Sequence, residues 1–251
     1  MAQYQHLSKA PIREALIDIR VQLPSEMDIT QLQSLHDGIK EQYPNKAEKR
    51  LWENKFEIKE GKPQPLVTSE TLSGYSFSTS TQDGAQVVQF RVDGFTFSRL
   101  RPYTNWEAFS SEAKRLWEIY AEFLKDTPPN ITRVATRYVN FLDLPLPISD
   151  PEQFITGLPK APSQRPLLSQ SFLNRIQVFD PSQGITAIVT KALIQPSSPS
   201  VATVLLDIDV FKAAIFEQNY VEAWNTIEAV KKLGNEIFFE AITDKTVETY
   251  K

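Results

Sequence analysis

Residues 104–124, TNWEAFSSEAKRLWEIYAEFL, contain the clearest helical pattern of the chain. Thr104 and Asn105 are residue types that cap helix N-termini, and apolar residues then recur at three- and four-residue spacing. Glu, Lys and Arg fill the opposite face, and the apolar stripe consists of Trp106, Phe109, Ala113, Leu116, Trp117, Tyr120, Phe123 and Leu124. This spacing predicts a long helix that buries one face against a sheet.

The residues before this helix alternate in the manner of strands. Apolar residues occupy every second position from Ile17 to Leu23, and Pro24 follows, which predicts a half-buried strand. A short helix is expected from residue 28 to about residue 39. A three-stranded meander is then expected, with a hairpin at Asp83-Gly84 and with Pro63 and Pro65 as a break, over residues 48–59, 72–81 and 86–98.

The second half repeats this order of elements. We expect a strand at 131–144, a short helix from Asp150, strands at 170–179, 185–195 and 201–211, and a long helix from about Tyr220 to Ile242. The clearest local similarity between the two halves is between residues 88–95 and residues 204–211, which are 116 positions apart. Trp106 and Trp224, in the two long helices, are 118 positions apart. Residues 1–128 and 129–251 are therefore predicted to be two repeats of one α+β unit within one compact domain. The alternative is a coincidence of two ordinary patterns.

Such a duplication implies a curved antiparallel sheet of up to eight strands, packed on two long helices, with its other face at least partly free. This architecture resembles the TATA-binding-protein-like and helix-grip folds. The resemblance is one of fold alone and carries no function.

The composition excludes most familiar catalytic sites. The 251 residues include no cysteine, two histidines, eight glycines and seventeen prolines. There is therefore no thiolate nucleophile, disulfide or cysteine-ligated metal, and His6 and His36 are expected to be ordinary surface residues. Neighbouring glycines are at least ten residues apart, which excludes the glycine-rich loops that hold nucleotide phosphates. No cofactor or metal site is predicted.

Charge and hydropathy bear on the binding partners and the cellular location of the protein. The net charge of −4 argues against broad nucleic-acid binding, and no apolar run is long enough to span a membrane. The N-terminal residues MAQYQHLSKA lack the basic start and apolar run of a secretory signal, so a cytoplasmic location is expected. Exposed sheet edges can pair between two copies of a chain, so a homo-oligomer is an alternative that the sequence does not decide.

Six of the eleven arginines lie between residues 91 and 137, which predicts a binding edge. In residues 95–103, FTFSRLRPY, arginine and aromatic residues alternate, a composition suited to gripping a phosphate, a carboxylate or a base. The candidate binding residues are Arg99, Arg101, Tyr103, Arg133, Arg137, Asn140 and Glu14. The competing interpretation is that these arginines pair with Asp and Glu across strands.

Acidic residues offer a weaker candidate. Asp207 and Asp209 share one face of a strand and could hold Mg²⁺ or act in acid–base chemistry, but no third ligand can be placed. Asp93 is the counterpart of Asp209 in the proposed repeat. On another strand, Glu14 and Asp18 share a face, from which they could pair with Arg133 or Arg137 in a buried, structural network. No catalytic residue is assigned.

Three short motifs carry a family resemblance: APIREA at residues 10–15, RYVN at 137–140 and FEAITDK at 239–245. Together they resemble a sporadically distributed, functionally uncharacterised prokaryotic family of about this length, and the resemblance spans the whole chain. The family brings no established activity. Its patchy distribution resembles that of accessory genes, including mobile-element and phage-defence genes, which implies partnership with the product of a neighbouring gene.

We therefore expect a non-enzymatic interaction protein, in which the sheet presents a surface to a protein partner and the Arg–aromatic edge supplies polar anchors. Two alternatives stay open. A small-molecule-binding or hydrolytic enzyme would bring Arg137, Asn140 and Glu14 together at a pocket between sheet and helices. A nucleic-acid-binding protein would bind with strong salt dependence and lose affinity on changing Arg99 and Arg101 to Ala.

Overall fold

The computed structural model describes residues 7–23, 27–59, 62–81, 84–148, 150–159, 171–217 and 219–251, with the backbone alone described for 52–59 and 62–69. Its body is a nine-stranded antiparallel sheet in the order β2-β3-β4-β5-β1-β6-β9-β8-β7. The strands are β1 (Ile12–Gln22), β2 (Asn45–Lys59), β3 (Lys62–Ser78), β4 (Gln86–Arg91), β5 (Gly94–Leu100), β6 (Asn130–Pro145), β7 (Leu173–Asp180), β8 (Ile185–Ile194) and β9 (Val201–Ala213).

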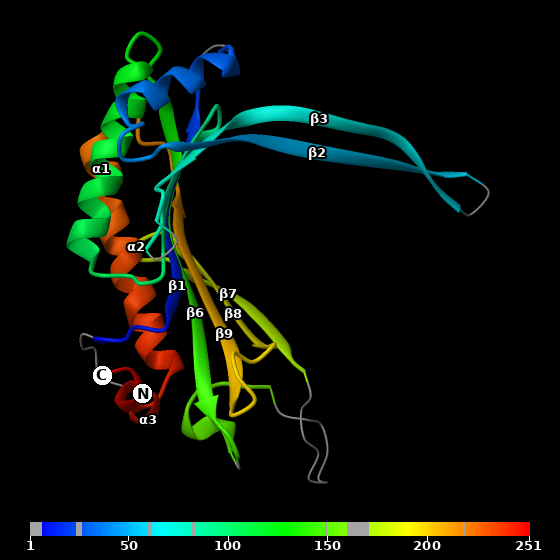
Figure 1. Ribbon diagram of the computed structural model, residues 1–251, viewed down its shortest axis with the longest axis vertical. Coiled ribbons are helices and arrows are strands. Elements are labelled where there is room, and N and C mark those ends of the chain that lie inside the picture. The colour runs from blue at the N-terminus through cyan, green and yellow to red at the C-terminus, as the bar shows by residue number, and fades with distance from the viewer. Residues whose placement is uncertain are drawn as a thin grey trace.

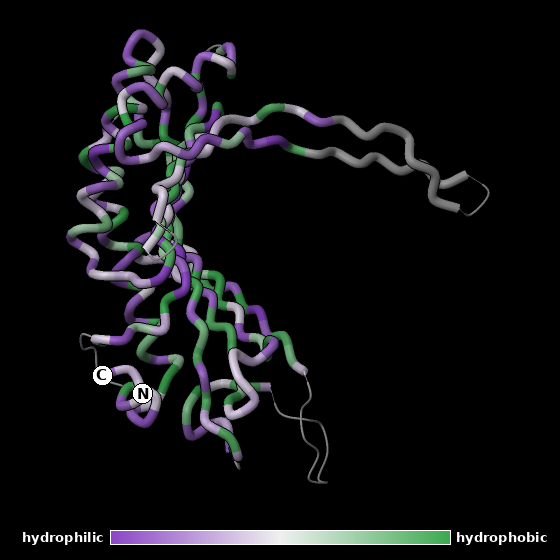
Figure 2. Tube along the Cα trace, viewed as in Figure 1, coloured by the Kyte–Doolittle hydropathy of each residue, from purple (hydrophilic) through white to green (hydrophobic). Residues whose placement is uncertain are grey.

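Two long helices, α1 (Trp106–Phe123) and α2 (Tyr220–Ala241), cover one face of this sheet (Figure 1). We call the covered face the inner face and the opposite one the outer face. The predicted α+β class, with an antiparallel sheet, is confirmed. Figure 2 shows hydrophilic and hydrophobic residues alternating along the central strands, as expected where each strand has one face on the core.

Both long helices form where their sequences predict them. The side chain of Asn105 accepts a hydrogen bond from the backbone N–H of Ala108 at 2.8 Å, which satisfies one of the open donors at the start of α1. Asn219 caps α2 in the same way, through the N–H of Glu222. The apolar stripe of α1 is buried against β5 and the neighbouring strands, so helix periodicity and sheet packing agree.

The short helices differ from the expectation. The segment expected to form a helix from residue 28 is a 3₁₀ helix, η1 (Ile29–Gly38), and the one from Asp150 is a single 3₁₀ turn, η2 (Pro151–Gln153). A short C-terminal helix, α3 (Asp244–Tyr250), was not predicted, because seven residues are too few to show a periodic pattern. Among the described residues, no helix is long and apolar enough to cross a membrane.

The expected meander over residues 48–98 is corrected in two places. The strand predicted at 86–98 is two strands, β4 and β5, which a tight turn at Val92 and Asp93 joins. Strand β3 continues through Pro63 and Pro65, whose positions predicted a break. That part of β3 pairs with β2 alone, so its other edge needs no N–H donors and tolerates proline. The predicted hairpin includes Asp83, which lies outside the described residues.

The β2–β3 hairpin projects from the body of the molecule as a long two-stranded arm (Figure 1). Strand β4 pairs with β3 only over Gly74–Ser78, and the remainder of β3 has β2 as its partner. A close approach at Gly74 lets β4 lie beside the base of the arm, because a Cβ there would lie 2.2 Å from the carbonyl oxygen of Phe90.

The strand order is symmetric about its centre. Strands β1 and β6 form the central pair; outward from β1 come β5, β4 and β3, and outward from β6 come β9, β8 and β7. Strand β2 has no counterpart beyond β7 in this order. The sheet has nine strands where up to eight were expected, because the strand expected at 86–98 is two strands, β4 and β5. The local similarity between 88–95 and 204–211 does not follow this order, because the first segment crosses the β4–β5 turn and the second lies within β9.

Candidate functional site

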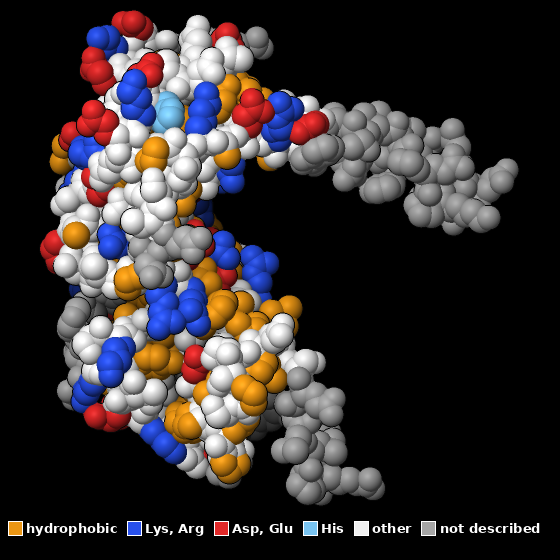
Figure 3. All heavy atoms as spheres, in the orientation of Figure 1, with side chains coloured by type: hydrophobic (Ala, Val, Ile, Leu, Met, Phe, Trp, Pro, Cys, Tyr) orange, Lys and Arg blue, Asp and Glu red, His pale blue; other side chains and the backbone are white. Residues whose placement is uncertain are grey.

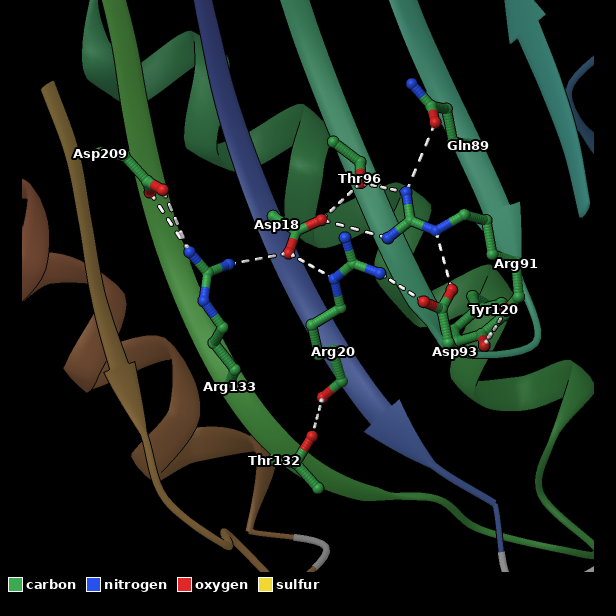
Figure 4. Close-up of polar contacts among 10 residues, drawn as sticks. All are labelled: Asp18, Arg20, Gln89, Arg91, Asp93, Thr96, Tyr120, Thr132, Arg133 and Asp209. Carbon is green, nitrogen blue, oxygen red and sulfur yellow. Dashed lines mark hydrogen bonds and ion pairs between the residues drawn. The ribbon is translucent and has the colours of Figure 1, made fainter. Parts of the chain in front are cut away.

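A network of arginines and aspartates crosses the outer face of the sheet (Figure 4). We call it the arginine–aspartate ladder, and it consists of Arg20, Arg91, Arg133, Arg137, Asp18, Asp93, Asp207 and Asp209. These residues come from β4, β1, β6, β9 and the β4–β5 turn. Ion pairs connect six of them across the central strands, and Arg137–Asp207 is a separate pair between β6 and β9. With four charges of each sign, the ladder is formally neutral.

Asp18 is the centre of the ladder. Its side chain is only 9% exposed and accepts four hydrogen bonds: from Thr96 Oγ1 at 2.7 Å, Arg91 Nη2 at 3.1 Å, Arg20 Nε at 3.0 Å and Arg133 Nη1 at 3.0 Å. Burial alone would raise the pKa of this carboxyl group, but the three guanidinium groups and the Thr96 hydroxyl together lower it below its ordinary value of 3.8. Asp18 is therefore held as a carboxylate.

The two ends of the ladder are more open. Arg20 and Arg91 share the exposed carboxylate of Asp93 on one side, and Arg133 Nη2 lies 3.3 Å from both oxygens of Asp209 on the other. Burial raises the pKa of Asp209, because the nearby arginines offset its desolvation only in part. The guanidinium of Arg133 also lies over the ring of Phe211.

Arg137 makes a two-point pair with Asp207, with Nε–Oδ1 at 2.8 Å and Nη2–Oδ2 at 2.6 Å. Asp207 and Asp209 are thus engaged by arginines, and within the described residues no group of three His or acidic side chains lies together as metal ligands would. Cross-strand pairing, the competing interpretation of the arginines, is found for Arg91, Arg133 and Arg137. Its physical effect is to hold the register of β1 against β5 and β6.

The sequence-predicted binding residues do not form one site. Arg133 and Arg137 lie on the outer face, and the strand register places Glu14 there too. Asn140 is three residues from Arg137 on the same strand, so alternation turns it to the inner face, and the three residues do not converge on one pocket.

Residues 99–103 likewise divide between two places. Arg99 donates to the carbonyl oxygen of Pro102 at 3.3 Å, and Arg101 is exposed beyond the end of β5. Tyr103 packs on the inner side, against the rings of Phe109 and Tyr138. His36, expected at the surface, is half-buried and stacks on Phe77.

The sheet also has an edge that the sequence did not single out. Strand β7 ends the sheet beside β8, and four of its apolar side chains are exposed: Leu173 by 74%, Ile176 by 50%, Val178 by 45% and Phe179 by 62%. Ile176 and Val178 lie opposite the buried residues Val189 and Ala187 on the inner face, whereas Leu173 and Phe179 lie on the outer face. Both faces of this edge strand are therefore apolar and open to solvent.

The reason for this exposure is the position of α2. The helix packs over β6 and β9, and it does not extend over β7. Figure 3 shows hydrophobic side chains gathered over the β7–β9 part of the molecule, whereas Lys, Arg, Asp and Glu mark its middle. The signal in the sequence is that apolar residues of 173–179 occupy both odd and even positions, a pattern that suits a strand covered on both faces.

No protein-family model, no curated protein and no solved structure matches this chain.

Proposed function

We propose that this chain is a non-enzymatic interaction protein that binds an extended segment of a partner protein along β7, as an added strand. The observation that carries the proposal is the apolar outer edge of β7, which pairs with no further strand among the described residues. Edge strands of soluble proteins are ordinarily protected against such pairing by charged residues, proline, bulges or a covering element. An edge without protection is a surface suited to a partner strand.

The two edges of the sheet differ in this respect. On β2, at the other edge, the residues near the body include Lys46, Glu48 and Arg50, all exposed, and charges of this kind oppose edge-to-edge association. Strand β7 contains neither lysine nor proline, its one exposed charged side chain is Arg175, and its pairing with β8 continues over eight residues without a register shift. The β2 edge thus carries more protecting charges than the β7 edge, which supports a role for β7.

The side chains of β7 define the partner segment. Added antiparallel to β7, the segment would place alternate apolar residues beside Ile176 and Val178 on the inner face and beside Leu173 and Phe179 on the outer face. Arg175 lies between the two outer apolar residues and favours an acidic residue opposite it. We infer that the partner is the product of a neighbouring gene, in an accessory role that includes phage defence, in a cytoplasmic setting.

The ladder supports this choice over nucleic-acid binding. Phosphate recognition needs arginines that are free to bind phosphate, and Arg20, Arg91, Arg133 and Arg137 each pair with an aspartate. Of the arginines that the sequence suggested as anchors, Arg133 and Arg137 thus stabilise the sheet, whereas Arg99 and Arg101 lie outside the ladder. The apolar edge takes their place as the binding surface.

We also propose that the fold arose by duplication of a strand, helix, three-strand, helix unit, over residues 1–128 and 129–251, and that it belongs with the TATA-binding-protein-like or helix-grip architectures. The symmetric strand order about β1 and β6 supports the duplication, as do the equivalent positions of α1 and α2 after each set of strands. Within this scheme β2 and the arm are an insertion in the first repeat.

Val178→Lys tests the edge. Co-expressed with the products of its neighbouring genes, the wild-type protein should retain one of them on purification, and the variant should retain at least about tenfold less, because a buried lysine at the centre of the added pair costs more than 1.4 kcal/mol. Both proteins should melt at similar temperatures, since Val178 is half exposed.

Val221→Lys is the matched control, because Val221 on α2 is 73% exposed and far from β7 in sequence. It should retain the partner fully. Equal retention by Val178→Lys and wild type would refute the proposal. So would a wild-type homodimer, by light scattering, that Val178→Lys converts to a monomer, because the edge would then be occupied by a second copy of this chain.

A further inference from the structure

The inner face of the sheet holds a cavity of about 250 Å³ beneath α1 and α2. It lies at the seam between two hydrophobic cores, one formed mainly by the first half of the chain and one by the second. Trp106 and Tyr138 belong to the first core, and Ile208 and Phe239 belong to the second; all four line the cavity. The two cores therefore leave unfilled space where they meet, and five of the seventeen residues that line it are aromatic.

One buried polar group is turned toward this space. Asn140 lines the cavity and is 1% exposed. Its Nδ2 donates to the carbonyl oxygens of Tyr138 at 3.2 Å and Leu206 at 3.0 Å, which fixes the orientation of the amide, because both partners are acceptors. Its carbonyl oxygen, Oδ1, accepts no hydrogen bond from the described residues.

That oxygen is also not sealed within the protein. Among the described residues, the fully covered polar side-chain atoms without a partner are Trp117 Nε1 and Thr136 Oγ1. Asn140 Oδ1 is not one of them, and because Asn140 lines the cavity, we infer that this oxygen faces it. An acceptor placed in this way leaves a hydrogen bond for a ligand to complete.

Gly234 supplies a second, independent observation. It lies within α2 and lines the cavity, although glycine is unfavourable inside a helix. Among the described residues, a Cβ at this position would meet Val210 Cγ2 alone, at 3.5 Å, so their packing does not require glycine there. The missing side chain keeps the cavity open.

We propose that this cavity binds a small aromatic molecule of one or two rings that carries an N–H or O–H donor for Asn140 Oδ1. A volume of 250 Å³ equals that of roughly eight liquid water molecules, which limits the ligand to this size. The aromatic residues in its walls favour a flat, apolar body. The cavity is separate from β7, so the proposed ligand site does not depend on the proposed partner-binding edge.

Indole and benzofuran form a matched pair of probes, since they share shape and size but only indole carries an N–H donor. Titrated into the full chain by calorimetry, indole should bind about tenfold more tightly than benzofuran, the difference expected for one buried hydrogen bond. In Asn140→Leu this preference should disappear, while benzofuran still binds.

Gly234→Ala keeps the test independent of any folding defect in the Asn140 variant. Its added methyl group should weaken both probes several-fold while the melting temperature stays equal or rises, because alanine favours the helix. Gly38→Ala, at a glycine with open space around it, should leave binding unchanged.

Three results would overturn the proposal. They are binding of neither probe up to about 1 mM, equal affinity for indole and benzofuran, and unweakened binding in Gly234→Ala. Binding that appears only after removal of residues 1–6 would also overturn it, since the N-terminal segment of the chain itself would then be the occupant.

Discussion

Replacing Asp18 by asparagine is expected to lower the free energy of unfolding by about 3–5 kcal/mol, the cost typical of breaking a buried charge network. The carboxylate of Asp18 accepts from three arginines and Thr96. Asparagine offers a single acceptor oxygen and turns an NH₂ group toward guanidinium donors. At least one arginine therefore loses its contact with residue 18 and keeps only its pair with the more exposed Asp93 or Asp209. Urea unfolding followed by tryptophan fluorescence measures the loss.

Asp93→Asn is the control for this prediction. Asp93 belongs to the same ladder, but its side chain is 55% exposed, so its ion pairs are screened by water and should contribute about 1 kcal/mol or less. A loss in Asp18→Asn no larger than that in Asp93→Asn would show that the ladder is not a stabilising network.

The effect of Asp18 should also depend on pH. Because folding lowers the pKa of this carboxyl group, its contribution is complete above the unfolded-state pKa and is lost as the pH falls through the lower folded-state value. The stability gap between wild type and Asp18→Asn should therefore be widest above about pH 5 and should close below pH 3.8. A gap that is constant from pH 7 to pH 3 would contradict this assignment.

Gly94→Ala should destabilise the protein by about 3 kcal/mol or more. Gly94 begins β5 with φ +152°, a conformation that side chains rarely adopt, and a Cβ there would lie 2.3 Å from the carbonyl oxygen of Ile19. Relief of that contact would force β5 away from β1. It would also draw Asp93, the adjacent residue, away from Arg20 and so disturb one end of the ladder.

The comparison with Gly38→Ala isolates the cause, because a Cβ at Gly38 would meet no atom of the described part of the chain within 4 Å. We expect a change in unfolding free energy within about 0.5 kcal/mol for that variant. Thermal unfolding by circular dichroism compares the two, and a loss in Gly94→Ala that matches the Gly38→Ala value would refute the close-approach argument.

Much of the fold was readable from local pattern. The apolar stripe and the Asn105 cap located α1 within two residues, and alternation located β1, β6, β8 and β9. Errors occurred where a local signal was overruled by position in the sheet. The β4–β5 turn contains Asp93-Gly94, the same type of turn dipeptide as residues 83–84, but the prediction followed the apolar alternation of residues 86–98 through it. Pro63 is tolerated in β3 because the arm has a free edge.

The candidate sites were harder to predict from the sequence, because they depend on which strands are neighbours in the sheet. The sequence could suggest that Asp18 pairs with Arg133, since both residues lie on strands. It could not show that β1 and β6 are neighbours at the centre of the sheet, which makes the pair buried. It also treated 170–179 as one strand of a meander, with nothing to mark that strand as the edge.

By itself, the sequence determined the element types, the α+β class and the exclusion of thiol and glycine-loop chemistry, because periodicity, capping and composition depend on residues close together in the chain. The tertiary structure alone decided that the arginines are paired with aspartates, that Asn140 faces a cavity and that β7 is an open edge. Those properties depend on strand order and register, which arise from contacts between residues about 50 to 120 positions apart.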